Sequence, residues 1–228
     1  MFVGGVALLL LLISRFDNIA YAAKSTGKKM VNKGGRVLKA PKVKLIIWGS
    51  NPLSAQIDQQ LRALMSSNYF NVLTEYGAGK PVYLGMVSST AAIPSKITDA
   101  SMANMIGQLI TAGKVPDFRK GQEMVYVIIT PPGTKNADKT GDAYNTNFSW
   151  GGSNLGVLAT YYGKQDIVSI TRSMSEEIAE AITNPGPKPG WQAGPDTLIG
   201  DPCSTPFKVN GVTVEGLWSN AKNACTTG

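Results

Sequence analysis

The stretch 167–185 reads IVSITRSMSEEIAEAITNP and predicts a helix over about Ile167–Thr183 that stops at Asn184-Pro185. At 100° per residue its larger apolar side chains fall on one face, which we expect to pack on a sheet. Polar side chains fall on the opposite face. The apolar set is Ile167, Ile170, Met174, Ile178, Ala181 and Ile182, and the opposite set is Arg172, Glu176, Glu180 and Thr183, with Glu177 on the flank.

Upstream of this helix, strand-like and helix-like segments alternate. Apolar, β-branched runs predict strands over residues 43–48, 81–87, 124–129 and 155–162, and apolar residues at helical spacing predict helices over about 57–65, 68–76 and 98–110. The polar residues 134–154 are expected to form a loop. Strands that alternate with helices around one core predict a single α/β domain with a mixed, mostly parallel sheet packed by helices.

The first part of the 228-residue chain is expected to lie outside this domain. Residues 2–13 are an apolar run too short to cross a bilayer comfortably, and Ala20-Tyr21-Ala22 has the form of a signal-peptidase site. We therefore interpret residues 1–22 as a signal peptide, residues 23–42 as a basic flexible arm and residues 43–228 as the folded domain. This predicts a secreted, extracellular or cell-surface protein without a membrane span after signal removal. A retained membrane anchor is the alternative.

The net charge of +7 comes mainly from basic residues near the N-terminal end of the expected domain and in the segment that precedes it. Such an arm could bind an anionic surface or polymer, although a Lys- and Gly-rich segment is more often a solvated linker. Its basic residues are not interleaved with aromatic ones, so specific nucleic-acid binding is not expected. The basic residues that precede Asp58, the first acid after the signal segment, are Lys24, Lys28, Lys29, Lys33, Arg36, Lys39, Lys42 and Lys44.

The two cysteines, Cys203 and Cys225, follow the helix. Export permits a disulfide, and two cysteines allow one intramolecular bridge, which would close the Pro- and Gly-rich loops of the C-terminal part. Two free thiols that bind a metal are the alternative. A separated pair without other Cys or His is, however, a poor zinc site.

Glu176 and Glu180 lie four residues apart, with Glu177 next to the first, as in the zinc-binding helix motif His-Glu-x-x-His. In that motif the first and last residues hold the metal, and the glutamate between them is general base to the bound water. Arg172 precedes Glu176 by four residues, so a solvated helix face with an ordinary ion pair is the alternative. Spacing alone favours that alternative.

The residues around this helix resemble those of a secreted bacterial and fungal family of metallopeptidase-like proteins. The family helix reads Ser-His-Glu-x-x-Glu-Ala-x-Thr-Asp/Asn-Pro, and the matching stretch here runs from Ser175 to Pro185. More distantly, the chain is similar to the plant phosphate-induced, EXORDIUM-like extracellular proteins. The further matching segments are Ile46-Ile47-Trp48-Gly49, Ser67-Asn68-Tyr69-Phe70, Leu73-Thr74-Glu75-Tyr76-Gly77, Tyr126-Val127-Ile128-Ile129 before Pro131-Pro132-Gly133, Gly190-Trp191, Leu198-Ile199-Gly200-Asp201-Pro202-Cys203, and Trp218-Ser219-Asn220 with Cys225.

This resemblance implies a zincin-like fold in which the helix forms one wall of a cleft. It also implies a metal site at Glu176, Glu180 and Asp201, with Glu177 as the catalytic base if the protein is active. The family histidine falls on Glu176 and a later family glutamate falls on Leu198, and the chain contains no histidine. The resemblance therefore implies a degenerate metal site.

Carboxylates without imidazole or thiolate suit calcium, magnesium or manganese rather than zinc. Packed negative charges are costly, so we expect either an acidic face open to solvent, with Arg172 nearby, or a hard cation among the carboxylates. Composition excludes Ser-His-Asp and Cys-His catalysis. We predict a secreted, non-catalytic binding module for an unknown extracellular ligand, with no cofactor required. The alternative is a divergent metal-dependent hydrolase or peptidase with a carboxylate-only site.

Overall fold

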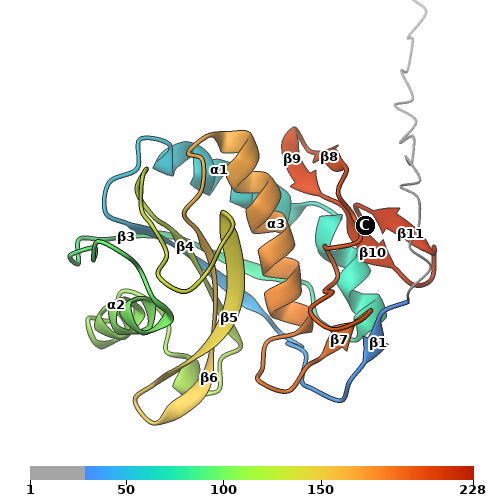
Figure 1. The fold of residues 1–228 in the computed structure, drawn as a ribbon, viewed down its shortest axis with the longest axis horizontal. Helices are drawn as coiled ribbons and strands as arrows, with labels where there is room; N and C mark the ends of the chain where they lie inside the picture. Colours follow the sequence, from blue (N-terminus) through green and yellow to red (C-terminus); the bar gives the residue numbers. More distant parts are fainter. Residues whose placement is uncertain (1–28) are drawn as a thin grey trace, which may run out of the picture.

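A five-stranded sheet forms the centre of the protein (Figure 1). The computed structural model describes residues 29–228, so the expected signal peptide, residues 1–22, and the first part of the expected arm lie outside the described residues. Four strands are parallel, and the edge strand β5 pairs antiparallel with β6. The predicted mixed, mostly parallel sheet is confirmed. The strand order is β3 (Val82–Ser89), β2 (Lys42–Trp48), β4 (Met124–Ile129), β6 (Ser153–Tyr161) and β5 (Ala143–Trp150).

Helices cover both faces of this sheet and create two cores. Successive side chains of a strand point to opposite faces, so Val125 and Val127 of β4 belong to one core, while Tyr126 and Ile128 belong to the other. Because both faces are covered, all of β4 is buried and its sequence is a continuous apolar run. The first core is covered by α1 (Ser54–Ser66) and α3 (Ile167–Thr183), and the second by α2 (Asp99–Thr111) and the short η2 (Phe118–Lys120).

The segment expected to be a loop, residues 134–154, contains the edge strand β5 and the start of β6. The two strands are joined by a tight turn at Gly151 and Gly152, both of which have positive φ. β5 reads AYNTNFSW, with little apolar alternation, and its backbone pairs with β6 along its length. The prediction of a loop was wrong because backbone pairing stabilises an edge strand whose side chains are mostly polar.

The residues after α3 form a further layer against that helix (Figure 1). The hairpins β8–β9 and β10–β11 pack with α3 and the 3-10 helix η1 in the first core. Cys203 and Cys225 form a disulfide within this layer, which confirms the predicted bridge and excludes two free thiols. The elements are η1 (Tyr69–Tyr76), β7 (Trp191–Gln192), β8 (Pro206–Val209), β9 (Val212–Glu215), β10 (Leu217–Ser219) and β11 (Ala224–Thr226).

The described part of the expected flexible arm, residues 29–42, packs against the domain. β1 (Val31–Asn32) pairs antiparallel with β7, and the Leu38 amide donates to the carbonyl of Ile182 near the end of α3. Met30 and Leu38 are buried. The structure thus differs from the expectation because two apolar side chains within a Lys-rich stretch anchor it. Within residues 29–228, no helix has the length and apolar character needed to cross a bilayer.

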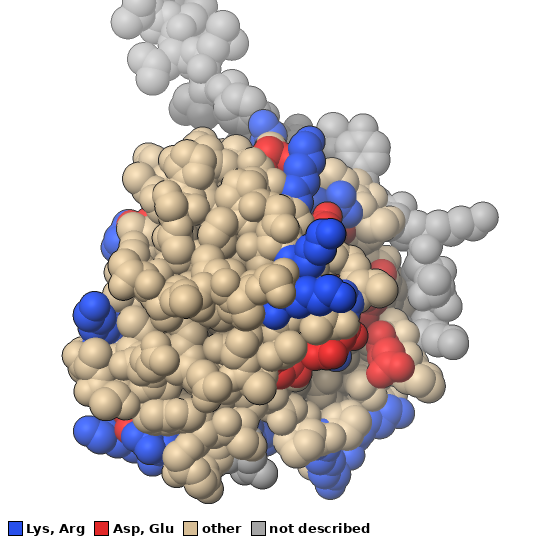
Figure 2. All heavy atoms as spheres, turned by 60° about the vertical axis from the view of Figure 1, so that its left-hand side comes forward, with Lys and Arg blue, Asp and Glu red and all other residues tan. Residues whose placement is uncertain are grey.

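Charged side chains are unevenly spread over the surface. Figure 2 shows a broad area without charged groups, with Lys and Arg mainly at its margins. Acidic side chains gather beside a hollow at one edge of this view. A molecule with a net charge of +7 therefore has both a neutral region and a local concentration of acids.

Candidate functional site

The helix α3 begins and ends where the sequence predicts, at Ile167 and Thr183. The Asp166 side chain caps it by accepting a hydrogen bond from the Ser169 amide at 2.9 Å. The predicted apolar face is buried against the sheet. The opposite face is not solvated either, since Glu180 on that face is also buried. An acidic helix face open to solvent, one of the two expected arrangements, is therefore not what the fold provides.

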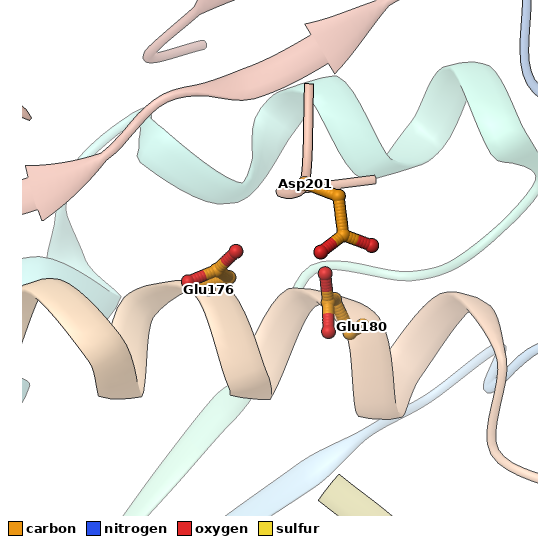
Figure 3. Close-up of side chains that lie close together, drawn as sticks. All are labelled: Glu176, Glu180 and Asp201. Atoms are coloured by element: carbon orange, nitrogen blue, oxygen red, sulfur yellow. The ribbon is translucent and has the colours of Figure 1, made fainter. Parts of the chain in front are cut away.

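Three carboxylates from two separate segments meet beside α3 (Figure 3). Glu176 and Glu180 lie one helical turn apart, and Asp201 faces them from the segment that follows β7. One oxygen of each lies within 4.8 Å of the others. The structure thus brings together the three residues predicted as metal ligands. That they bind a metal stays a prediction.

The turn at residues 198–201 fits closely over the helix. The Gly200 amide donates to Glu180 Oε1 at 3.3 Å, and the Leu198 amide donates to Asp201 Oδ2. A Cβ on Gly200 would lie 2.4 Å from Glu176 Cγ, so a larger residue would displace that glutamate. Leu198, on which the resemblance places a glutamate, therefore contributes a backbone donor to the site and no carboxylate.

Asn145 is a site residue that sequence reasoning missed. Its Nδ2 donates to Glu177 Oε2 at 2.9 Å and to Glu180 Oε2 at 3.0 Å. Asn145 lies on β5, in the segment expected to be a loop, and its two partners are 32 and 35 residues away. No local pattern could have indicated it. The contact holds Glu177 beside β5, next to the cluster of three rather than within it.

Burial raises the pKa values of these acids. Glu177 and Glu180 are 8% and 5% exposed. Loss of hydration, with neighbouring carboxylates adding to it, raises the pKa of Glu176 to about 8 and that of Glu177 to about 7. The pKa of Glu180 lies well above its ordinary value for the same two reasons. Asp201 is exposed at the surface, and partial loss of hydration raises its pKa to a smaller extent. The folded protein therefore disfavours the fully charged form of the cluster.

Arg172 does not form the ion pair with Glu176 that was the alternative to a metal site. Its Nε donates to Glu215 Oε2 and its Nη2 donates to the Ser204 carbonyl at 2.9 Å. The charge of Arg172 lowers the pKa of Glu176, but burial and the neighbouring acids outweigh that effect. Among residues 29–228, no Lys or Arg forms a salt bridge with Glu176, Glu177, Glu180 or Asp201.

The donor set does not fit zinc. Its atoms are all carboxylate oxygens, the chain has no histidine, and both cysteines are in the disulfide. Structural and catalytic zinc sites rely on imidazole or thiolate, whereas calcium, magnesium and manganese accept oxygen ligands. A hard divalent cation is thus the kind of ion that these side chains fit.

Comparisons with known proteins leave the family open. No family model matches the chain, and no curated protein matches it. Among solved structures, the crystal structure of metalloproteinase-II from Bacteroides fragilis matches with 16% sequence identity and a TM-score of 0.31. The match covers 60% of this chain and 42% of that one, so the chain spans less than half the length of this neighbour. A likeness this weak assigns neither a site nor an activity.

Proposed function

We propose that this protein is a secreted, metallopeptidase-like binding module that holds a hard divalent cation in the carboxylate cluster of α3 and does not cleave peptides. The observation that carries the proposal is the convergence of Glu176, Glu180 and Asp201, whose oxygens lie within 4.8 Å of one another. Two oxygens bound to one calcium ion at about 2.4 Å are at most about 4.8 Å apart. Any two of the three oxygens therefore meet this limit, and the three side chains surround a place where a cation would be shared.

The burial of Glu180, beside the half-buried Glu176 and the exposed Asp201, supports a bound cation. Several carboxylates in a poorly hydrated place repel one another and lose hydration, unless protons or a cation neutralise them. The donors that reach them, the Asn145 side-chain amide and the backbone amides of Leu198 and Gly200, are neutral. A divalent cation would supply the positive charge that these neighbours lack.

The donor chemistry supports a non-catalytic role. Zinc peptidases use three protein ligands, usually including imidazole, to lower the pKa of a bound water to near neutral. Here Glu176 stands where the resembling family has histidine, and Leu198 stands where it has glutamate. Calcium and magnesium in an all-oxygen site suit the binding of a ligand or the stabilisation of a loop better than the activation of water.

A divergent metal-dependent hydrolase is the second candidate, and the position of Glu177 favours it. This carboxylate lies next to the cluster, at the place of the general base in the His-Glu-x-x-His spacing, and Asn145 orients it. Its role would be to accept a proton from a nucleophilic water. Such an enzyme would require both the cation and Glu177.

A cation titration of the protein after EDTA treatment tests the proposal. We expect calcium, magnesium or manganese to raise the melting temperature, with a gain of about 2.7 kcal/mol at one hundred times the Kd. Elemental analysis should find about one ion per chain. Glu180→Ala should abolish the response, whereas Asp138→Ala, a change to an exposed acid outside the cluster, should leave it intact.

Two results would overturn the proposal in different ways. An unchanged melting temperature with and without every cation would remove the cation site. Chelator-sensitive peptide cleavage that disappears in Glu177→Gln would instead establish the hydrolase.

A further inference from the structure

The outer face of α2 is unusual because it carries hydrogen-bonding side chains without charge. The helix reads DASMANMIGQLIT, and its one charged residue, Asp99, lies in the first turn. Ser101, Asn104, Gln108 and Thr111 recur at spacings of three and four residues and form one stripe on the exposed side. Surface helices usually place charged residues there. The chain has 22 basic and 15 acidic residues, so this stripe is not explained by a general lack of charge.

Two hollows lie along this stripe and together form what we term the α2 groove. One, of about 410 Å³, lies between α2 and residues 91–94, and the other, of about 480 Å³, lies between α2 and Trp150. Both are lined by Asn104 and Gln108, so these two side chains lie between the hollows and border each of them. None of the lining residues is charged. Figure 2, in which the side of the molecule that bears α2 comes forward, shows a broad area without charged groups.

Both ends of the α2 groove are held in place. The ring of Trp150 lies so close to the backbone of α2 that a Cβ on Gly107 would be 2.2 Å from it. Arg119 covers the ring at 4.2 Å, and Asp117 fixes Arg119 through hydrogen bonds of 2.9 and 2.7 Å. At the other end, the indole of the buried Trp48 donates to the carbonyl of Ala91 at 2.9 Å. A ligand would therefore meet a preformed surface with little ordering cost.

We propose that the α2 groove binds a neutral, extended carbohydrate chain. The Asn104 and Gln108 amides each offer a carbonyl acceptor and an amino donor, which is the combination that sugar hydroxyls require. The two open hollows on either side of these amides suit a chain long enough to contact both, and the Trp150 edge adds apolar surface for sugar C–H groups. The positive molecule would attract anionic polymers elsewhere on its surface, but a groove without charges has no means of selecting them.

Titration calorimetry with cellohexaose and chitohexaose, two uncharged hexasaccharides, tests this inference. The wild-type protein should bind at least one of them, and Asn104→Ala with Gln108→Ala should weaken that binding about tenfold, as expected for the loss of two hydrogen bonds. Both side chains are exposed, so the variant should keep its melting temperature. Gln56→Ala with Gln59→Ala, which removes two exposed amides from α1, is the matched control and should bind like wild type.

The inference fails if neither hexasaccharide binds, or if the α2 variant binds as well as the control variant. Binding of the anionic hexagalacturonate alone would point to the basic surface instead and would also overturn it. A change of oligomeric state in the α2 variant, measured by sedimentation without any sugar, would identify the groove as a protein contact. EDTA should not alter sugar binding, because the groove shares no residue with the carboxylate cluster.

Discussion

Glu180 combines the deepest burial among the clustered acids with two hydrogen bonds from neutral donors, the Asn145 and Gly200 amides. In the folded protein its pKa lies well above the ordinary value of 4.5, as do those of Glu176 and Glu177. Folding therefore favours the protonated acids. The stabilising effect is complete below the unfolded pKa and is lost as the pH rises through the folded values. Without a cation, these residues should make the protein less stable at higher pH.

The first prediction isolates this effect with Glu180→Gln in the presence of EDTA. Glutamine resembles the neutral acid, so the variant should lose less stability than wild type between about pH 5 and about pH 8, by at least about 1 kcal/mol. Urea denaturation at several pH values measures the difference. Asp138→Asn, at an exposed position, should follow the wild-type curve. An equal loss in wild type and Glu180→Gln would show that this carboxyl does not carry the effect.

At the scale of elements, the edge strand β5 completes the site. It brings Asn145 to the side of the sheet on which α3 packs, and it brings Trp150 to the opposite side, against α2. The same strand therefore borders both the carboxylate cluster and the α2 groove. This follows from the alternation of strand side chains, since positions 145 and 150 point to opposite faces.

The second prediction concerns Asn145→Ala. The change leaves two buried carboxylates without their shared donor and should cost about 1–3 kcal/mol in the free energy of unfolding. Asn147→Ala is the control, because Asn147 lies on the same face of β5 and forms no side-chain hydrogen bond within residues 29–228. Urea denaturation compares the two. A loss of the same size in both variants would show that the strand, rather than the amide bridge, determines stability.

At the scale of the whole molecule, the layer formed by the residues after α3 determines which groups surround the carboxylate cluster. It covers the polar face of α3, supplies Asp201 and the Gly200 amide, and takes Arg172 away from the cluster to Glu215. The disulfide between Cys203 and Cys225 closes this layer two residues after Asp201. The integrity of the cluster should therefore depend on the bridge.

The third prediction is that Cys203→Ser with Cys225→Ser destabilises the protein by about 3 kcal/mol, the value expected for a loop of this length. Because Asp201 would be held less firmly, the rise in melting temperature caused by calcium should also be smaller than in wild type. Urea denaturation and thermal melts with and without calcium measure the two effects. A stability loss with an unchanged calcium response would show that the bridge supports the layer without positioning Asp201.

The sequence alone determined those features of the fold that short stretches of residues specify. The bounds of α3 follow from the apolar period and the Asn184-Pro185 stop, and the buried parallel strands follow from their apolar runs. Two cysteines leave one possible intramolecular bridge, and resemblance to a family helix indicated which acids to consider.

Tertiary structure alone decided the environment of those acids. The polar β5 is specified by backbone pairing with β6 rather than by its own side chains. Asn145 reaches Glu177 and Glu180, and Arg172 pairs with Glu215, only because the chain folds back over 32 to 43 residues. Helical periodicity predicted which residues form the polar face of α3, but not which segments would pack over that face. Burial of a charge depends on what packs over it, and that packing comes from segments far away in the sequence.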